Sequence, residues 1–257
     1  MSKFLLSSLF LLSLLPVLPT SSPLQTPDDV VEKHLAAVGG RAALGKLTSR
    51  KATGTVTITT PNGALSGPIE IYSKAPNKTR AYMQLDLTAL GVPDKMVVEQ
   101  KFDGTAGWTL NSMQGNSEIV GNQLQNMRNN VFPSPLMGYK AAGTKIEILP
   151  KEQLAGKEVI VLLVTPKEGS VARVFFDAET YLIVRTVAKI SSPELGEFEQ
   201  TGEPSDYRVV DGVKIPFALT NTSPVQTLTI RFEKIEHNVA IDDAMFVVKS
   251  PIDGTTR

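Results

Sequence analysis

The sequence predicts a mainly β protein with some α-helix, built as a single curved antiparallel sheet. Short runs with a two-residue hydrophobic alternation recur along most of the chain, and tight turns separate them. Two stretches with helical spacing, near the N-terminus and in the middle of the chain, are the candidates for covering the sheet. We therefore expect an incomplete β-barrel of about 11 strands, covered by N-terminal helices and a central helical insertion.

The chain begins with the pattern of an export signal. Lys3 precedes an apolar, leucine-rich run over residues 4–18. This run is shorter than the ~20 apolar residues that a membrane-spanning helix needs, and a basic residue followed by a short apolar run is typical of a secretory signal peptide. We expect residues 1–22 to be a signal peptide that is removed, with an uncleaved anchor as the alternative. Residues 23–257 then form a single exported, periplasmic domain.

The first helices follow this segment. Thr26 is a capping residue, Pro27 suits the first helical position, and acidic residues 28–29 face the positive end of the helix dipole. Apolar residues recur at helical spacing up to Gly39–Gly40, which is a typical helix end. A short second helix is expected over residues 41–47.

The strands begin after the second helix. Thr53 and Thr55 belong to an alternating run, and Asn62-Gly63 suits a hairpin turn. The run 159–164 is apolar at every position, so we expect both of its faces to be covered. Short strands joined by turns favour antiparallel hairpins. The expected strands are residues 50–59, 64–73, 80–87, 96–102, 145–149, 157–165, 172–177, 182–190, 197–210, 213–222 and 226–236.

The middle of the chain changes character. In residues 117–130, Ile119, Leu124 and Met127 recur at helical spacing among amide residues. Residues 132–137 then form an apolar loop bent by prolines. We expect a helical insertion followed by a flexible gate.

Composition excludes several function classes. The chain has 26 basic and 26 acidic residues, so it lacks the cationic field of a nucleic-acid binder. It has no cysteine, which excludes disulfides, thiolate zinc sites and a cysteine nucleophile. Its two histidines, His34 and His237, are too few to favour a metal site. No hydrolase or phosphate-loop motif is present, so we expect no enzyme activity, cofactor or metal.

A curved sheet covered by helices is a natural apolar receptacle. Apolar residues of the expected strands, insertion and gate are the candidates for its wall, and methionine adapts well to irregular ligands. Ordinary core packing is the alternative for each of them. The candidate ligand-binding residues are Met83, Leu85, Trp108, Leu124, Met127, Phe132, Leu136 and Met137.

Four segments carry a resemblance to a known family: Gly39–Leu47, Lys74–Arg80, Phe102–Trp108 and Asp206–Pro216. In these segments and in its layout the chain resembles the periplasmic lipoprotein carriers and outer-membrane lipoprotein-sorting proteins, which have the LolA/LolB-like fold. The resemblance implies an incomplete β-barrel, closed by helices, whose apolar cavity holds acyl chains. A carrier of that family latches its helical lid with an arginine, for which Arg80 is a candidate counterpart here.

We therefore expect an exported, soluble and monomeric protein that shelters a lipid or the acyl chains of a lipoprotein. Its partners would be that lipid or acyl chain and, in addition, an exported or membrane protein. The alternative is an envelope sensor or protein-interaction module on the same scaffold. In that case an exposed edge strand, or the acidic stretch Glu194–Glu203, would matter more than a cavity.

Overall fold

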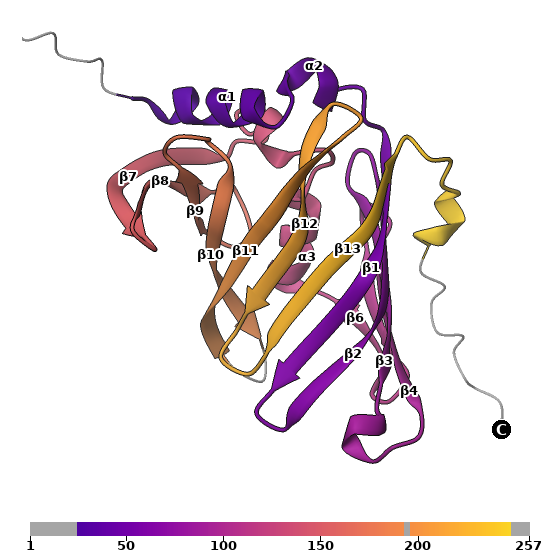
Figure 1. The fold of residues 1–257 in the computed structure, drawn as a ribbon. Coiled ribbons are helices and arrows are strands. Elements are labelled where there is room, and N and C mark those ends of the chain that lie inside the picture. The colour runs from indigo at the N-terminus through magenta and orange to yellow at the C-terminus, as the bar shows by residue number, and fades with distance from the viewer. Residues whose placement is uncertain (1–24, 193–195, 248–257) are drawn as a thin grey trace, which may run out of the picture.

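The computed structural model of the protein describes residues 25–192 and 196–247 (Figure 1). The expected signal peptide, residues 1–22, lies outside the described residues. Within the described residues, no helix combines the length and the apolar character needed to cross a membrane.

The described residues are mainly β, with short helices near the two ends and in the middle of the chain. The α-helices are α1 (Pro27–Ala37), α2 (Gly40–Leu44) and α3 (Gly121–Asn129), and the 3-10 helices are η1 (Thr88–Leu90), η2 (Pro135–Met137) and η3 (Asp243–Met245). The first strands are β1 (Ser49–Thr60), β2 (Gly63–Lys74), β3 (Lys78–Asp86), β4 (Lys95–Phe102), β5 (Gly107–Asn111) and β6 (Gly115–Ile119). The remaining strands are β7 (Lys145–Leu154), β8 (Lys157–Thr165), β9 (Ala172–Asp177), β10 (Ile183–Ser192), β11 (Gly196–Val210), β12 (Val213–Thr222) and β13 (Thr227–His237).

All strands join one antiparallel sheet of 13 strands, in the order β6-β5-β4-β3-β2-β1-β13-β12-β11-β10-β9-β8-β7. β6 and β7 are consecutive in the chain and yet occupy the two opposite edges of the sheet. The segment between them, residues 120–144, must therefore cross from one edge to the other. This crossing carries α3 and η2, and in Figure 1 α3 is seen behind β12, within the curve of the sheet.

The sheet has two more strands than expected. β5 and β6 were missed, and Ser117–Ile119, expected to begin the central helix, is the end of β6 instead. β6 has a single apolar residue, Ile119, which is 3% exposed. A five-residue strand with one apolar position shows no recognisable period. The expected mainly β class, antiparallel pairing and covering helices are confirmed.

The N-terminal helices pack on the upper end of the sheet (Figure 1). Thr26 and Asp29 form a capping box at the start of α1. Val30, Val31 and Leu35 of α1 are buried in a core with Phe176 of β9 and other strand residues. This burial supplies the main stabilisation of so short a helix, because isolated helices of this length are marginal in water.

Two strand glycines allow a close approach of neighbouring backbone because they have no side chain. A Cβ atom at Gly54 of β1 would lie 2.1 Å from the carbonyl oxygen of Arg231, and one at Gly67 of β2 would lie 1.6 Å from that of Gln84. Neither distance is compatible with a side chain, so only glycine fits. Strand glycines of this kind let a sheet curl and enclose a concave face.

The apolar strand β8 is covered on both faces, as its sequence predicted. Ile160 and Leu162 belong to the inner core with α1, whereas Val159 and Val161 pack on the outer side with Phe175 of β9. The outer cluster includes Leu149 and Leu154 of the edge strand β7. Two side chains of the edge strand β7 therefore extend the apolar cluster on the outer face of the sheet.

Candidate functional site

A cavity of about 890 Å³ lies on the concave face of the sheet. One wall comes from Ile71, Ala81 and Gln100, which stand opposite one another on β2, β3 and β4. The other wall includes Val174 and Thr186, which are paired on β9 and β10. Its volume is in the range of pockets that bind drug-sized or lipid-like ligands.

Helix α3 lines this cavity and is hydrogen-bonded to the loop between β8 and β9. The Asn126 side chain donates from Nδ2 to Ser170 Oγ at 2.9 Å and accepts from the Ser170 backbone N–H at 2.8 Å. Asn129 Nδ2 donates to the carbonyl oxygen of Glu168 at 2.7 Å. These amides explain the polar composition of the insertion, since they take the place of apolar packing.

The other side of α3 is bound to the opposite half of the sheet. Arg128 Nη2 donates to the carbonyl oxygen of Thr105 at 3.0 Å, and Asn77 Nδ2 donates to that of Arg128 at 3.3 Å. Polar contacts of α3 therefore reach both the β2–β5 half of the sheet and the β8–β9 half.

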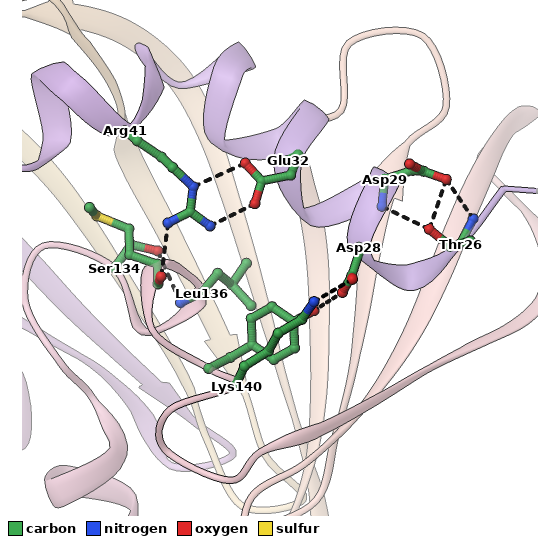
Figure 2. A network of polar contacts seen from close by, with 10 residues as sticks. Thr26, Asp28, Asp29, Glu32, Arg41, Ser134, Leu136 and Lys140 are labelled. Atoms are coloured by element: carbon green, nitrogen blue, oxygen red, sulfur yellow. Dashed lines mark hydrogen bonds and ion pairs between the residues drawn. The ribbon is translucent and has the colours of Figure 1, made fainter.

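A second polar network joins α1 and α2 to the loop that follows α3 (Figure 2). The Arg41 guanidinium binds both carboxylate oxygens of Glu32 and donates from Nη1 to the carbonyl oxygen of Met137 at 2.9 Å. Lys140 and Tyr139 both donate to the Asp28 carboxylate. These two contacts, that of Lys140 first, hold the pKa of Asp28 below its ordinary value. The pairs are exposed, so each adds little stability, but together they fix the loop under α1.

His34 of α1 is on the wall of the cavity and is 6% exposed. Its Nδ1 lies 2.9 Å from the carbonyl oxygen of Tyr181. Burial lowers the pKa of His34, and the hydrogen bond to Tyr181 opposes this effect. The ring also packs edge-on against Phe176, with 5.3 Å between ring centroids. The histidine is therefore held in one orientation by α1 and by the β9–β10 turn.

A second buried cluster lies beside the loop. The Arg50 guanidinium is 5.4 Å from the ring centroid of Phe132, and burial lowers the pKa of Arg50. His237 lies opposite Arg50 on β13, and its Nδ1 is 3.1 Å from Asp211 Oδ2. Burial, the largest cause, lowers the pKa of His237. The two histidines do not form a metal site: within the described residues, no three His, Cys, Asp or Glu side chains are grouped as ligands.

The lining of the cavity is uncharged. Among the described residues that line it there is no Asp, Glu, Lys or Arg. Its apolar part includes Ile71, Val164 and Val174, and its polar part is made of amide and hydroxyl side chains and the His34 ring. The lining amides are Gln100, Asn122, Gln123, Asn126, Asn129, Asn130 and Gln200.

The structure places the eight candidate residues in five different surroundings. Met127 and Leu136 are on the cavity wall. Met83 and Leu85 belong to a separate packed cluster, and Leu85 is fully buried there. Whether any of the eight contacts a ligand stays a prediction.

The other four candidates lie away from the wall. Phe132 and Met137 pack in the core with α1, and Leu124 is half-buried on α3. Trp108 is on the opposite face of the sheet, because its neighbour Thr109 pairs with the lining residue Gln100 and side chains alternate along a strand.

Arg80, the candidate lid-latching arginine, is likewise on the outer face. Its neighbour Ala81 lines the cavity, and Arg80 itself pairs with Glu99 at 2.5 Å. It also lies over the rings of Tyr72 and Tyr82. Arg80 therefore belongs to a band of charged and aromatic side chains on the outside of the sheet.

The sequence did not identify His34 or the amides as cavity residues. The amides of residues 117–130 were visible as a polar face of the expected helix, and that face was the available signal. The orientation of His34 depends on the distant residue Tyr181, so no local pattern indicates it.

No family model matches the sequence, and no curated protein matches it. Among solved structures, the fold is similar to a LolA superfamily protein from Nitrosomonas europaea, with a TM-score of 0.55, 10% identity and coverage of 87% of this chain and 98% of that one. A domain from Vibrio parahaemolyticus, named for outer membrane lipoprotein sorting, gives a TM-score of 0.55, 10% identity and coverage of 85% and 94%. A DUF1329 family protein from Desulfovibrio piger gives a TM-score of 0.55 and 13% identity, with coverage of 86% of this chain and 96% of that one. At these identities the likeness concerns the fold, and the chain has a LolA-like fold.

Proposed function

We propose that the protein is an exported, non-enzymatic carrier that shelters an apolar chain, from a lipid or from a lipoprotein, in the cavity of its curved sheet. The observation that carries this proposal is the cavity of about 890 Å³ between α3 and the concave face. Burying each CH₂ group of a ligand gains about 0.8 kcal/mol, so an apolar chain binds there without any catalytic group.

Two further observations support the same proposal. The LolA-like fold is shared with a domain named for outer membrane lipoprotein sorting, and the apolar run near the N-terminus has the pattern of an export signal. Residues 23–257 are proposed to act as one lipid-binding domain after residues 1–22 are removed.

The acidic stretch supports the interaction-module alternative less strongly in the folded protein than its sequence alone does. Glu199 lies 3.5 Å from Arg173, and Glu203 lies 2.6 Å from Arg185. These two carboxylates are partly neutralised by arginines of the same sheet. They therefore offer a weaker attraction to a basic partner than their sequence indicates.

The test is binding of the uncharged apolar dye N-phenyl-1-naphthylamine, together with native mass spectrometry of the purified protein. We expect the wild type to bind the dye and to carry co-purifying lipid. Ala81→Phe and Ala172→Phe each place a ring in the cavity from opposite walls. Each is expected to weaken dye binding at least about tenfold, which corresponds to ~1.4 kcal/mol.

The matched control is Thr55→Phe. Thr55 is exposed and lies between Gly54 and Val56, whose positions face inward, so the added ring stands on the outer face. Dye affinity should then stay at the wild-type value. If the two cavity variants bind the dye as well as this control does, or if the wild type binds neither dye nor lipid, the carrier function is refuted.

A further inference from the structure

The chemistry of the cavity wall narrows the class of ligand. The lining residues include no Asp, Glu, Lys or Arg, so a charged group placed inside would have no partner of opposite charge. Burying an unpaired charge is strongly unfavourable. The cavity therefore disfavours a carboxylate, phosphate or ammonium within it.

His34 adds a directional polar group to this uncharged wall. A carbonyl oxygen accepts hydrogen bonds and cannot donate them, so the 2.9 Å contact with Tyr181 requires the proton of the ring to be on Nδ1. Burial disfavours the charged ring. The neutral ring then carries a free lone pair on Nε2, and no hydrogen bond to Nε2 forms within the residues that the structure describes.

A lone pair of this kind needs a donor. Two of the lining amides are already engaged, since Asn126 is bonded to Ser170 and Asn129 to Glu168. Within the described residues, Nε2 of His34 is not among the fully buried polar atoms that lack a partner. Because His34 lines the cavity, a donor inside the cavity can reach this lone pair. A ligand with a hydroxyl group at this point would satisfy His34 without bringing a charge into the cavity.

We propose that the cavity takes an uncharged, hydroxyl-bearing lipid of the acylglycerol type, whose hydroxyl donates to Nε2 of His34 while its acyl chain lies along the apolar wall. This inference rests on the proposed carrier function and specifies its ligand. The lining hydroxyls and the other lining amides accommodate the remaining polar atoms of such a headgroup, and Ile71, Val164 and Val174 accommodate the chain.

The experiment displaces bound N-phenyl-1-naphthylamine at pH 8 with three competitors that share one oleoyl chain. Monooleoylglycerol is uncharged and has hydroxyl donors, methyl oleate is uncharged and has none, and oleate is charged. We expect monooleoylglycerol to displace the dye at about fivefold lower concentration than methyl oleate, the worth of one hydrogen bond. Oleate should need at least about tenfold more than monooleoylglycerol.

Two variants of His34 connect the preference to the ring. His34→Phe removes the acceptor, so monooleoylglycerol and methyl oleate should become equal competitors. His34→Gln keeps a side-chain carbonyl as acceptor and an amide N–H for Tyr181, so it should retain part of the preference. The ratio between two competitors is measured on one protein, which makes it independent of small losses of folded material.

The outcomes separate this inference from the function on which it rests. If no competitor displaces the dye, the carrier function fails. If methyl oleate or oleate displaces the dye as well as monooleoylglycerol does, the carrier function stands and the hydroxyl-lipid inference is wrong. The inference is also wrong if His34→Phe keeps the wild-type preference. If His34→Phe does not fold, the competitor series on the wild type and on His34→Gln still tests the hydroxyl-lipid inference.

Discussion

One strand, β3, passes through two different parts of the same concave face. We call the part that holds the cavity the hollow end, and the part that holds the packed cluster around Leu85 the filled end. Thr79 and Ala81 line the cavity. Further along the same face, Met83 and Leu85 belong to a packed cluster with Val56, and Leu85 is fully buried. Both ends share the sheet curvature and the strand pairing. The volume of the side chains therefore decides whether the concave face is filled by the protein itself or left open for a ligand.

The two ends are also closed by different interactions. The filled end is closed by apolar contacts among strands, whereas the hollow end is covered by α3, none of whose residues is buried. The contacts of α3, such as those of Asn126 and Arg128, are hydrogen bonds that water can replace. Segments held in this way open at lower free energy than a packed core does, so we propose that a ligand enters at the hollow end.

Truncating one large side chain at each end gives the largest expected difference. Leu85→Ala leaves a void in a fully buried cluster and should lower the free energy of unfolding by about 2–5 kcal/mol. Met127→Ala removes a half-buried side chain that already borders the cavity, and about 1 kcal/mol is expected. Urea unfolding of both variants measures the two values.

Ligand binding should follow the opposite order. Leu85→Ala is expected to keep the wild-type affinity for N-phenyl-1-naphthylamine, whereas Met127→Ala changes it because the wall itself is altered. Equal losses of stability, or a loss of dye binding confined to the filled end, would show that the division between the ends is wrong.

The attachment of α3 gives a smaller effect that is confined to the hollow end. Asn126→Ala removes both hydrogen bonds to Ser170 and should favour opening of α3 by about 1–2 kcal/mol. Hydrogen exchange of the α3 amides is then expected to be roughly 5–30-fold faster, with exchange at the filled end unchanged. Asn116→Ala, at an exposed position of β6, is the control. Unchanged exchange in α3 would mean that other contacts hold the helix.

The sequence was sufficient for the sheet but not for the difference between its ends. Alternation and turns predicted strands such as 213–222 with their observed bounds. Met83 and Met127, in contrast, were equal candidates by residue type. Only the β3 pairing and the attachment of Asn126 to the distant Ser170 separate them. Trp108 illustrates a second limit, because a shift of one residue along a strand moves a side chain to the other face.

The smallest expected effect concerns protonation at the hollow end. An unfolded histidine binds a proton near its ordinary pKa of 6.5, whereas burial lowers the pKa of His34 in the folded protein. Below about pH 6.5 the unfolded state therefore binds more protons than the folded state does. The contribution of the neutral His34 ring to the free energy of unfolding should therefore be complete above that pH. It should decrease as the pH falls towards the lowered pKa of His34.

His34→Gln should reduce this decrease, as measured by urea unfolding between neutral and mildly acidic pH. His237, whose pKa is also lowered by burial, contributes in the same direction, so part of the dependence should remain until His237→Gln is added. The second histidine lies outside the cavity lining. Its substitution is therefore expected to change the pH dependence of stability without changing the preference for a hydroxyl-bearing lipid, whereas His34→Gln changes both. A pH dependence unaltered by either substitution would contradict the buried, neutral state of the His34 ring.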